Sequence, residues 1–405
     1  MRLVITFLAL FFSLPSADAE PQKPAPFQQA LPGYDFQFPR DDFSHDKFRI
    51  EWWYYTGNLE DEKGRPFGYQ LTFFRVGLDG ANPIDNPSAW KIDHIYFAHM
   101  TVSDIHENKF YFFERINRKG MKNAGAKSDR LHVWNEDWSL TSKDKSHHLK
   151  AQENGTGLDL KLTPIKKRVL HGMEGISKKG SGSGNASHYF SFTRMETTGQ
   201  VLLKGEAVPV RGTSWMDHEF SSNQLNENLV GWDWFSIKLD NRTELMLYQL
   251  RDKNGGKDPH SSGTLIFPNG QSRHILHHEF SITANKFWTS PHTKAAYPAD
   301  WTLTLPEGVL NITPDFPDQE LYNLRSISAS YWEGSVSITG KFQGKKVSGK
   351  GCSHGDRNGP RQLSRQTAEN RRTPMLDAPE WRRQDSGVVV DQAAIATGAG
   401  TRNLA

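Results

Sequence analysis

Three ionisable side chains and a tryptophan lie within five residues of one another near the middle of the sequence. They are Trp215, Asp217, His218 and Glu219, in the run RGTSWMDHEFSS at 211–222. Histidine titrates near neutral pH and therefore suits general acid–base chemistry. Side chains alternate between the two faces of a strand, so neither neighbouring carboxylate can simply orient the imidazole of His218 if this run is a strand. The orienting group must then come from elsewhere, and Glu51 or Tyr248 could supply it.

The same cluster also has a structural interpretation. Buried polar side chains are normally hydrogen-bonded, and a cluster of this kind could tie two domains together without any catalytic role. The candidate catalytic residues are thus His218, Asp217, Tyr248 and Glu51, and the structural alternative stays open.

Glu51 lies in the densest aromatic run of the chain, RIEWWYYTGNL at 49–59. Strand alternation places Glu51 on one face with Trp53 and Tyr55, and Ile50, Trp52 and Tyr54 on the other. Because both faces carry large side chains, we expect this strand to be covered on both sides. A buried carboxyl has a raised pKa unless a cation pairs with it. Arg75 or Arg211 could be that cation, so Glu51 is either an active acid or part of a structural ion pair.

Seven aromatic residues could line an apolar pocket. Small β-barrels can hold one ligand in their interior, although filling the core is the commoner use of such side chains. The candidate ligand-binding residues are Trp52, Trp53, Tyr55, Trp215, Phe220, Trp232 and Trp234.

The sequence gives less support to metal, nucleotide-binding or serine-hydrolase chemistry. A metal site that combines His218, Asp217 or Glu219 with His99 is compatible in residue type, but no paired histidine spacing links these residues. No P-loop or dinucleotide-binding motif occurs, and no serine lies in the strand–turn–helix pattern that a nucleophile elbow needs. The sequence therefore predicts no metal and no cofactor, and it gives little support to a serine hydrolase.

The elements that must position these residues are short strands. The chain has 405 residues, enough for two or three domains, and 12% of them are aromatic. Alternating runs separated by Gly, Asn, Asp and Pro recur from about residue 50 to 349, which is typical of all-β barrels or sandwiches. We expect one domain at 36–225 and a second at 226–351. A formal net charge of +3, without a clustered basic face, predicts no nucleic-acid partner.

Both ends of the chain differ from this body. Residues 1–19 resemble a secretory signal, with Arg2, an apolar stretch and an A-x-A site ending at Ala19, so we expect an exported mature protein without a transmembrane segment. Residues 20–35 are predicted to be a flexible leader and 172–186 a mobile loop. From 352 to 405 alternation stops and lysine is absent, which predicts a disordered tail or an altered reading frame. The single cysteine, Cys352, falls in that tail.

The two motifs EWWYYTGNL and GTSWMDHEFSS together resemble the lipocalin-like family of carotenoid 1,2-hydratase (hydroxyneurosporene synthase) and the secreted AttH-like proteins, labelled predicted secreted hydrolases. The resemblance implies two tandem calycin-type antiparallel β-barrels and an association with an ABC transport system. The hydratases use a His-x-Trp and a Tyr-x-Asp whose Asp donates a proton. This chain has His218 and Tyr248 at the matching positions, but Phe220 replaces the Trp and Leu250 the acid.

These observations favour an exported lipocalin-like protein that binds a lipid-like or polyene-like apolar molecule, linked to ABC transporter components. One alternative is a carotenoid 1,2-hydratase-like or hydrolase enzyme, with His218 as acid or base and Asp217, Tyr248 or Glu51 assisting. Another is a structural envelope protein whose aromatic side chains all pack in the core.

Overall fold

The computed structural model describes residues 27–78, 93–120, 122–223, 229–254, 256–327 and 329–356. The expected signal segment at 1–19 lies outside these residues, and so does the tail after residue 356 with its proposed change of reading frame. Among the described residues, no helix has the length and apolar character that crossing a membrane requires.

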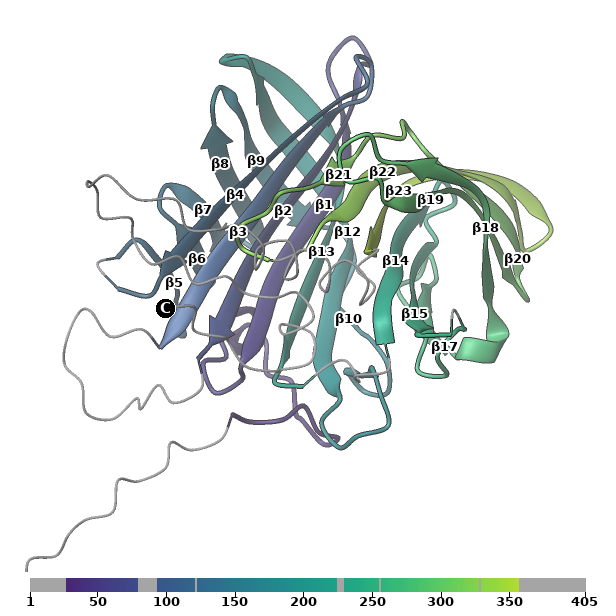
Figure 1. The fold of residues 1–405 in the computed structure, drawn as a ribbon, viewed down its shortest axis with the longest axis horizontal. Coiled ribbons are helices and arrows are strands. Elements are labelled where there is room, and N and C mark those ends of the chain that lie inside the picture. Colours follow the sequence, from purple (N-terminus) through teal and green to yellow (C-terminus); the bar gives the residue numbers. More distant parts are fainter. Residues whose placement is uncertain are drawn as a thin grey trace, which may run out of the picture.

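The described residues form an all-β structure (Figure 1). Two 3-10 turns, η1 (Arg40–Asp42) and η2 (His277–Glu279), accompany the strands. In chain order, the strands are β1 (Ile50–Glu60), β2 (Pro66–Gly77), β3 (His94–Asp104), β4 (Lys109–Arg118), β5 (Ala124–Ala126), β6 (His132–Asn135), β7 (Trp138–Lys143), β8 (Ser146–Glu153), β9 (Thr156–Pro164), β10 (Val169–Leu170), β11 (Ile176–Lys178), β12 (Ala186–Leu203), β13 (Glu206–Ser221), β14 (Leu229–Leu239), β15 (Glu244–Asp252), β16 (Ser262–Ile266), β17 (Ser272–Ile275), β18 (Ser281–Thr289), β19 (Ala296–Leu305), β20 (Gly308–Pro314), β21 (Glu320–Leu321), β22 (Tyr331–Phe342) and β23 (Lys345–Asp356).

The first thirteen strands form one sheet, which we call the first barrel. Within the described residues its order is β4-β3-β2-β1-β13-β12-β9-β8-β7-β6-β5, with β10 and β11 also paired to β12. The two ends approach each other where Lys119 and Gly120, just after β4, bridge to Ala124 of β5, so the barrel is nearly closed. Alternate side chains of its strands fill the interior, including Trp53, Tyr55 and Phe220.

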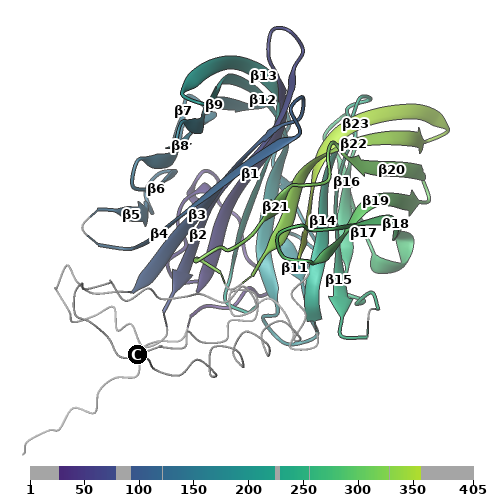
Figure 2. The same ribbon diagram turned by 45° about the horizontal axis from the view of Figure 1, so that its top comes forward.

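Strands β14 to β23 form a second sheet, ordered β17-β16-β15-β14-β23-β22-β20-β19-β18 with β21 beside β22. It curves into a half-barrel that stands beside the first barrel (Figures 1 and 2). The predicted all-β fold with two antiparallel barrel units in tandem is confirmed, the second unit being a half-barrel.

The two motif strands lie at the junction of these units. β1 pairs with β13 along its whole length, so that Trp53 is opposite His218 and Tyr54 is opposite Asp217. Their inner faces point into the first barrel. Their outer faces point towards the second sheet, where the Tyr54 hydroxyl donates to Glu333 at 2.6 Å.

Three segments differ from the sequence prediction. Residues 27–35 were expected in a flexible leader, but Ala30 is buried and packs beside Ile176. The predicted mobile loop at 172–186 contains β11, which pairs with β12. The predicted last strand at 346–349 continues as β23 through Cys352 to Asp356, because Gly351 lets the chain approach the carbonyl oxygen of Ser236, where a Cβ atom would lie 2.1 Å away.

Candidate functional site

The central motif divides between the two faces of β13. His218 and Phe220 point into the first barrel, where both are fully buried. Asp217 and Glu219 point the other way and line a pocket against the second sheet. The alternation predicted from the sequence therefore separates the imidazole from both neighbouring carboxylates, and the two faces have different roles.

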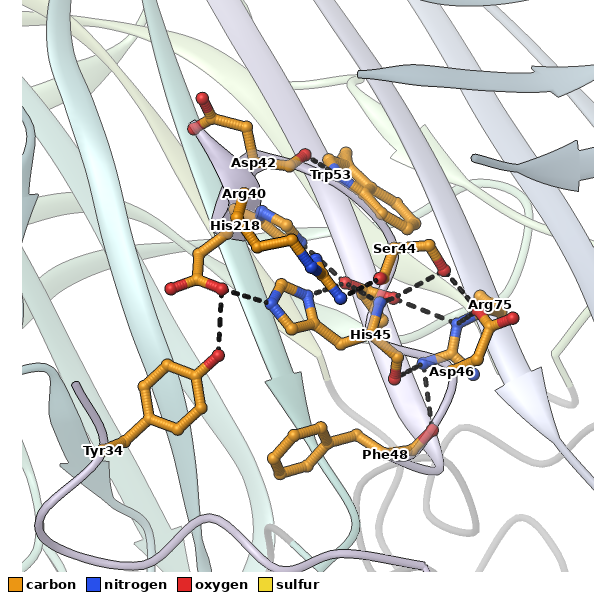
Figure 3. A network of polar contacts seen from close by, with 12 residues as sticks. Tyr34, Arg40, Asp42, Ser44, His45, Asp46, Phe48, Trp53, Arg75 and His218 are labelled. Carbon is orange, nitrogen blue, oxygen red and sulfur yellow. Dashed lines mark hydrogen bonds and ion pairs between the residues drawn. The ribbon is translucent and has the colours of Figure 1, made fainter. Parts of the chain in front are cut away.

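His218 belongs to a buried ionic network at one end of the first barrel (Figure 3). Its Nε2 lies 2.9 Å from Glu51 Oε1, and His45 Nδ1 lies 2.7 Å from the same oxygen. Arg75 donates from Nε to Glu51 Oε2 at 3.0 Å, while its Nη2 donates to the carbonyl oxygens of His45 and Phe48. Of the two cations considered for Glu51, the structure thus places Arg75 beside it. Arg211 instead pairs with Glu60 on the surface.

The charges in this network stabilise one another. Burial alone would raise the pKa of Glu51, but the charges of Arg75 and His45, with a hydrogen bond from His218, hold it well below its usual range. Burial lowers the pKa of His218, and the interaction with Glu51 only partly offsets this. Burial opposes protonation of His45 too, but Glu51 and Asp41 outweigh it and raise its pKa.

The network holds the N-terminal segment against the barrel. His45 stacks on Phe220 with ring centroids 3.6 Å apart, and its Nε2 lies 3.1 Å from Asp41. Since His218 and Glu51 are fully buried beneath this segment, their contacts support the structural interpretation of both residues. His45 had no motif to mark it, although it stands six residues before Glu51.

The atoms of His45, Glu51 and His218 also form a group that could hold a metal ion, with ligand atoms within 4.8 Å of one another. Both imidazoles already contact one oxygen of Glu51, and Arg75 occupies the other. A divalent cation would displace these contacts and lie close to a guanidinium charge, so the residues fit an ion-pair network better. Within the described residues, the metal set considered from sequence forms no ligand group, and both ring nitrogens of His99 are bonded to the hydroxyls of Tyr331 and Ser326.

The pocket between the first barrel and the second sheet, which we call the interdomain pocket, encloses about 770 Å³ including space open to solvent. Its walls are mostly aromatic, and β1, β2, β3, β13, β14, β22 and β23 all contribute to them. The lining residues are Trp52, Tyr54, Gln70, Thr72, Phe74, Phe97, His99, Asp217, Glu219, Trp232, Trp234, Ile327, Tyr331, Glu333 and His354.

Asp217 is the acidic residue of this pocket whose pKa is shifted to near neutral pH. Burial raises its pKa to about 7, the nearby Glu219 adds to the shift, and hydrogen bonds from Ser191 and Trp215 oppose it. The Trp215 indole donates to Asp217 Oδ1 at 2.6 Å, and Ser191 donates to the same oxygen. Burial also raises the pKa of Glu219, against the effect of Lys179. A neutral carboxyl at this position can donate a proton near neutral pH.

The predicted ligand-binding residues fall into three groups. Trp52, Trp232 and Trp234 line the interdomain pocket. Trp53, Tyr55 and Phe220 instead pack in the filled interior of the first barrel, because they lie on the inner faces of β1 and β13. Trp215 is fully buried behind Asp217 and orients it.

Tyr248 lies apart from His218, which it was considered to assist. It belongs to β15 of the second sheet, and its hydroxyl contacts Ser177, Ser262 and the carbonyl oxygen of Lys178. Leu250, at the position of the hydratase acid, is buried in the same apolar cluster as Tyr248. The position that the resemblance to the hydratases assigns to a proton donor is therefore occupied by a core side chain.

Sequence reasoning missed Glu333 and His354, which lie opposite each other on β22 and β23. Glu333 stands in the run YWEGSV, where an acid follows two aromatic residues much as Glu51 neighbours Trp52 and Trp53. This similarity to the Glu51 run could have marked Glu333 as a candidate site residue. His354 was hidden because the chain from residue 352 on was assigned to the tail.

Three buried histidines make stability depend on pH. Burial lowers the pKa of His99 and of His188 to about 4 and that of His147 to about 3, from an ordinary 6.5. Between pH 6.5 and pH 4 the unfolded chain binds protons at these residues and the folded chain does not, so stability falls as pH falls. Asp217, with its raised pKa, offsets part of this. We expect the free energy of unfolding to drop by on the order of 5 kcal/mol over that range in urea titrations. A constant value would contradict the neutral, buried state of these histidines.

Comparison with known proteins relates the chain to one group. A family model described as AttH-like matches residues 29–351. The crystal structure of a protein from Nitrosomonas europaea described as AttH has a TM-score of 0.74 and 34% identity, covering 81% of this chain and 98% of that chain. Kievitone hydratase from Nectria haematococca shares the fold, with a TM-score of 0.62 and 15% identity over 82% of this chain and 97% of that chain. In sequence, kievitone hydratase of Fusarium solani subsp. phaseoli is 24% identical over 185 residues, which span 44% of this chain and 52% of that relative, about half its length.

Proposed function

The chain belongs to the AttH-like family, and from that premise we propose that it binds an apolar, lipid-like or polyene-like small molecule in the interdomain pocket. The observation that carries this proposal is the pocket itself, about 770 Å³ including space open to solvent, with walls formed largely by Trp52, Phe74, Trp232 and other aromatic residues. Burying apolar surface there would contribute roughly 25 cal/mol per Å², before the costs of ordering the ligand. The first barrel is a packed core, so the pocket supports binding outside that barrel.

The test is organic extraction and mass spectrometry of the protein purified from its own host. A stoichiometric apolar compound would support the proposal and would supply the molecule for turnover assays. A protein that carries no such compound and also binds no apolar fluorescent probe would contradict it. That outcome would leave the structural envelope protein as the better description.

Replacing Trp232 by alanine should weaken binding of the apolar compound about tenfold or more, because an aromatic wall of the pocket is removed. Binding would be measured by quenching of intrinsic tryptophan fluorescence, with Trp134→Ala on β6 as the control that loses a tryptophan elsewhere. Trp53→Ala should lower stability instead, since that side chain lies in the core of the first barrel. Equal losses of affinity in the Trp232 and Trp134 variants would place the ligand elsewhere.

A second candidate function is acid-catalysed hydration of an alkene, favoured by the raised pKa of Asp217 in the pocket wall and by the naming of a relative as a hydratase. The carboxyl proton of Asp217 would pass to one alkene carbon, and the π electrons would form the new C–H bond. Water would then add to the cationic carbon and release a proton, and Asp217 would regain a proton from solvent. In this proposal Asp217 takes the role that Leu250 cannot perform.

Export and contact with ABC transporter components are further proposals, and they rest on the signal-like residues 1–19 and on the family resemblance. The intact mass of the protein from its host tests the first of them. A mature chain that begins at Glu20 would support export, and a chain that retains residues 1–19 would contradict it. Cross-linking in the host envelope, followed by identification of transporter subunits, would test the second.

A further inference from the structure

One wall of the interdomain pocket carries a carboxylate–imidazole pair. His354 Nδ1 lies 2.7 Å from Glu333 Oε2, and Glu333 also accepts hydrogen bonds from the Tyr54 hydroxyl at 2.6 Å and the Cys352 thiol at 3.0 Å. A carboxylate has only acceptors, so the proton of the His354–Glu333 contact belongs to Nδ1. The other ring nitrogen of a neutral His354, Nε2, then presents a lone pair.

Nε2 of His354 is a buried atom with no hydrogen-bond partner among the residues that the structure describes. The ring is fixed by its surroundings, because it stacks on Trp232 with centroids 5.5 Å apart and lies 4.8 Å from the ring of Tyr331. Trp232, Tyr331 and His354 all line the pocket. A buried acceptor without a partner costs free energy, and a donor on a bound molecule would remove that cost.

Gln70 adds a second polar group of the same kind to the pocket wall. Its Nε2 contacts the Thr72 hydroxyl, while its Oε1 is buried without a partner among the described residues. The two ends of an amide are interchangeable in assignment, so the free end is either an acceptor or a donor. A hydroxyl group both donates and accepts, and it therefore satisfies either orientation as well as His354 Nε2.

We propose that the ligand of the interdomain pocket is an apolar molecule that carries a hydroxyl group, an alcohol or a phenol, and that His354 Nε2 accepts the hydrogen bond from this hydroxyl. The inference rests on the proposed binding function and narrows its ligand class. Glu333 is the positioning residue, because it fixes the tautomer and the orientation of the imidazole. An alcohol is also the product of alkene hydration, so the same contact suits either a carrier or an enzyme.

The experiment compares farnesol with farnesyl methyl ether, which keeps the oxygen and the chain but lacks the donor. Affinities of the full-length protein would be measured by fluorescence quenching and by calorimetry. We expect farnesol to bind about tenfold more tightly, as one net hydrogen bond would provide. Equal affinities in the unaltered protein would overturn the inference without any variant.

Two variants assign the preference to His354. His354→Phe keeps an aromatic ring against Trp232 but has no acceptor, and it should bind both probes with the affinity that the unaltered protein shows for the ether. His354→Gln can place an amide oxygen near the position of Nε2 and should restore part of the preference. A tenfold preference that persists in His354→Phe would overturn the role of this residue.

The outcomes also separate the inference from the function on which it rests. If both probes bind equally and Trp232→Ala weakens both, the binding function stands and the hydroxyl contact is wrong. If neither probe binds and the protein from its host carries no apolar compound, the binding function itself fails and the inference fails with it.

Discussion

Replacing Glu51 by glutamine is expected to lower the free energy of unfolding by about 3–5 kcal/mol, because one partner of a buried ionic network is lost. The substitution removes the charge that both Arg75 and His45 contact directly, and leaves them only Asp46, 3.9 Å from Arg75, and Asp41, 3.1 Å from His45. Glutamine has nearly the same size as glutamate, so packing is preserved and the effect isolates the charge. Urea denaturation followed by circular dichroism would measure it.

The matched control is Glu60→Gln, at the exposed end of the same strand. Glu60 pairs with the surface residue Arg211, and exposed pairs of this kind contribute little. We therefore expect that control to leave stability nearly unchanged. If Glu51→Gln were as stable as the control but had lost turnover, Glu51 would be an active acid and the structural interpretation of this network would be wrong.

Replacing Asp217 by asparagine should lower turnover of the compound recovered from the protein by about 100- to 10,000-fold, the range typical for loss of a general acid. Asparagine keeps the shape of the side chain and can still accept hydrogen bonds from Trp215 and Ser191. Binding of the compound should therefore be retained. The difference between lost turnover and retained binding separates a proton donor from a residue that merely shapes the pocket.

Asp159→Asn, at an exposed position of β9, is the control for this substitution and should have no effect on turnover. Infrared spectroscopy gives a readout that does not depend on the substrate. A protonated carboxyl band should disappear as pH rises through about 7 and should be missing from Asp217→Asn. A band that persists in the variant, together with unchanged turnover, would contradict the assignment of Asp217 as the acid.

Much of the architecture follows from short-range patterns. The run at 49–59 and the run at 211–222 each alternate in a way that requires a two-sided strand, and the structure pairs them residue by residue. The same alternation separates His218 from Asp217 and Glu219 by face. These predictions succeed because the period of a strand is a local property of the backbone.

Alternation alone could not decide which face lines a pocket. Trp52 and Trp53 are adjacent and chemically identical, yet one lines the interdomain pocket and the other lies in the barrel core. The difference depends on how the second sheet packs against the first, which involves residues about 280 positions away, such as Glu333 beside Tyr54. Contacts over such separations leave no local signature.

The sequence prediction for the end of the last strand, β23, was wrong for a different reason. Small residues such as Gly351 and Ser353 weaken the alternating pattern, so the sequence predicted that order ends before them. In the structure these small residues allow β23 to fit between β14 and β22. The same error concealed His354, the residue to which we assign ligand recognition.

The most direct test of the central claim is a crystal structure of the protein with its recovered apolar compound, or with farnesol if none is recovered. We expect density for the molecule between Trp52 and Trp232, within reach of Asp217 and His354. Density inside the first barrel, around Trp53 and Tyr55, would contradict the account, because it would show that the barrel core opens and that the interdomain pocket is not the ligand site.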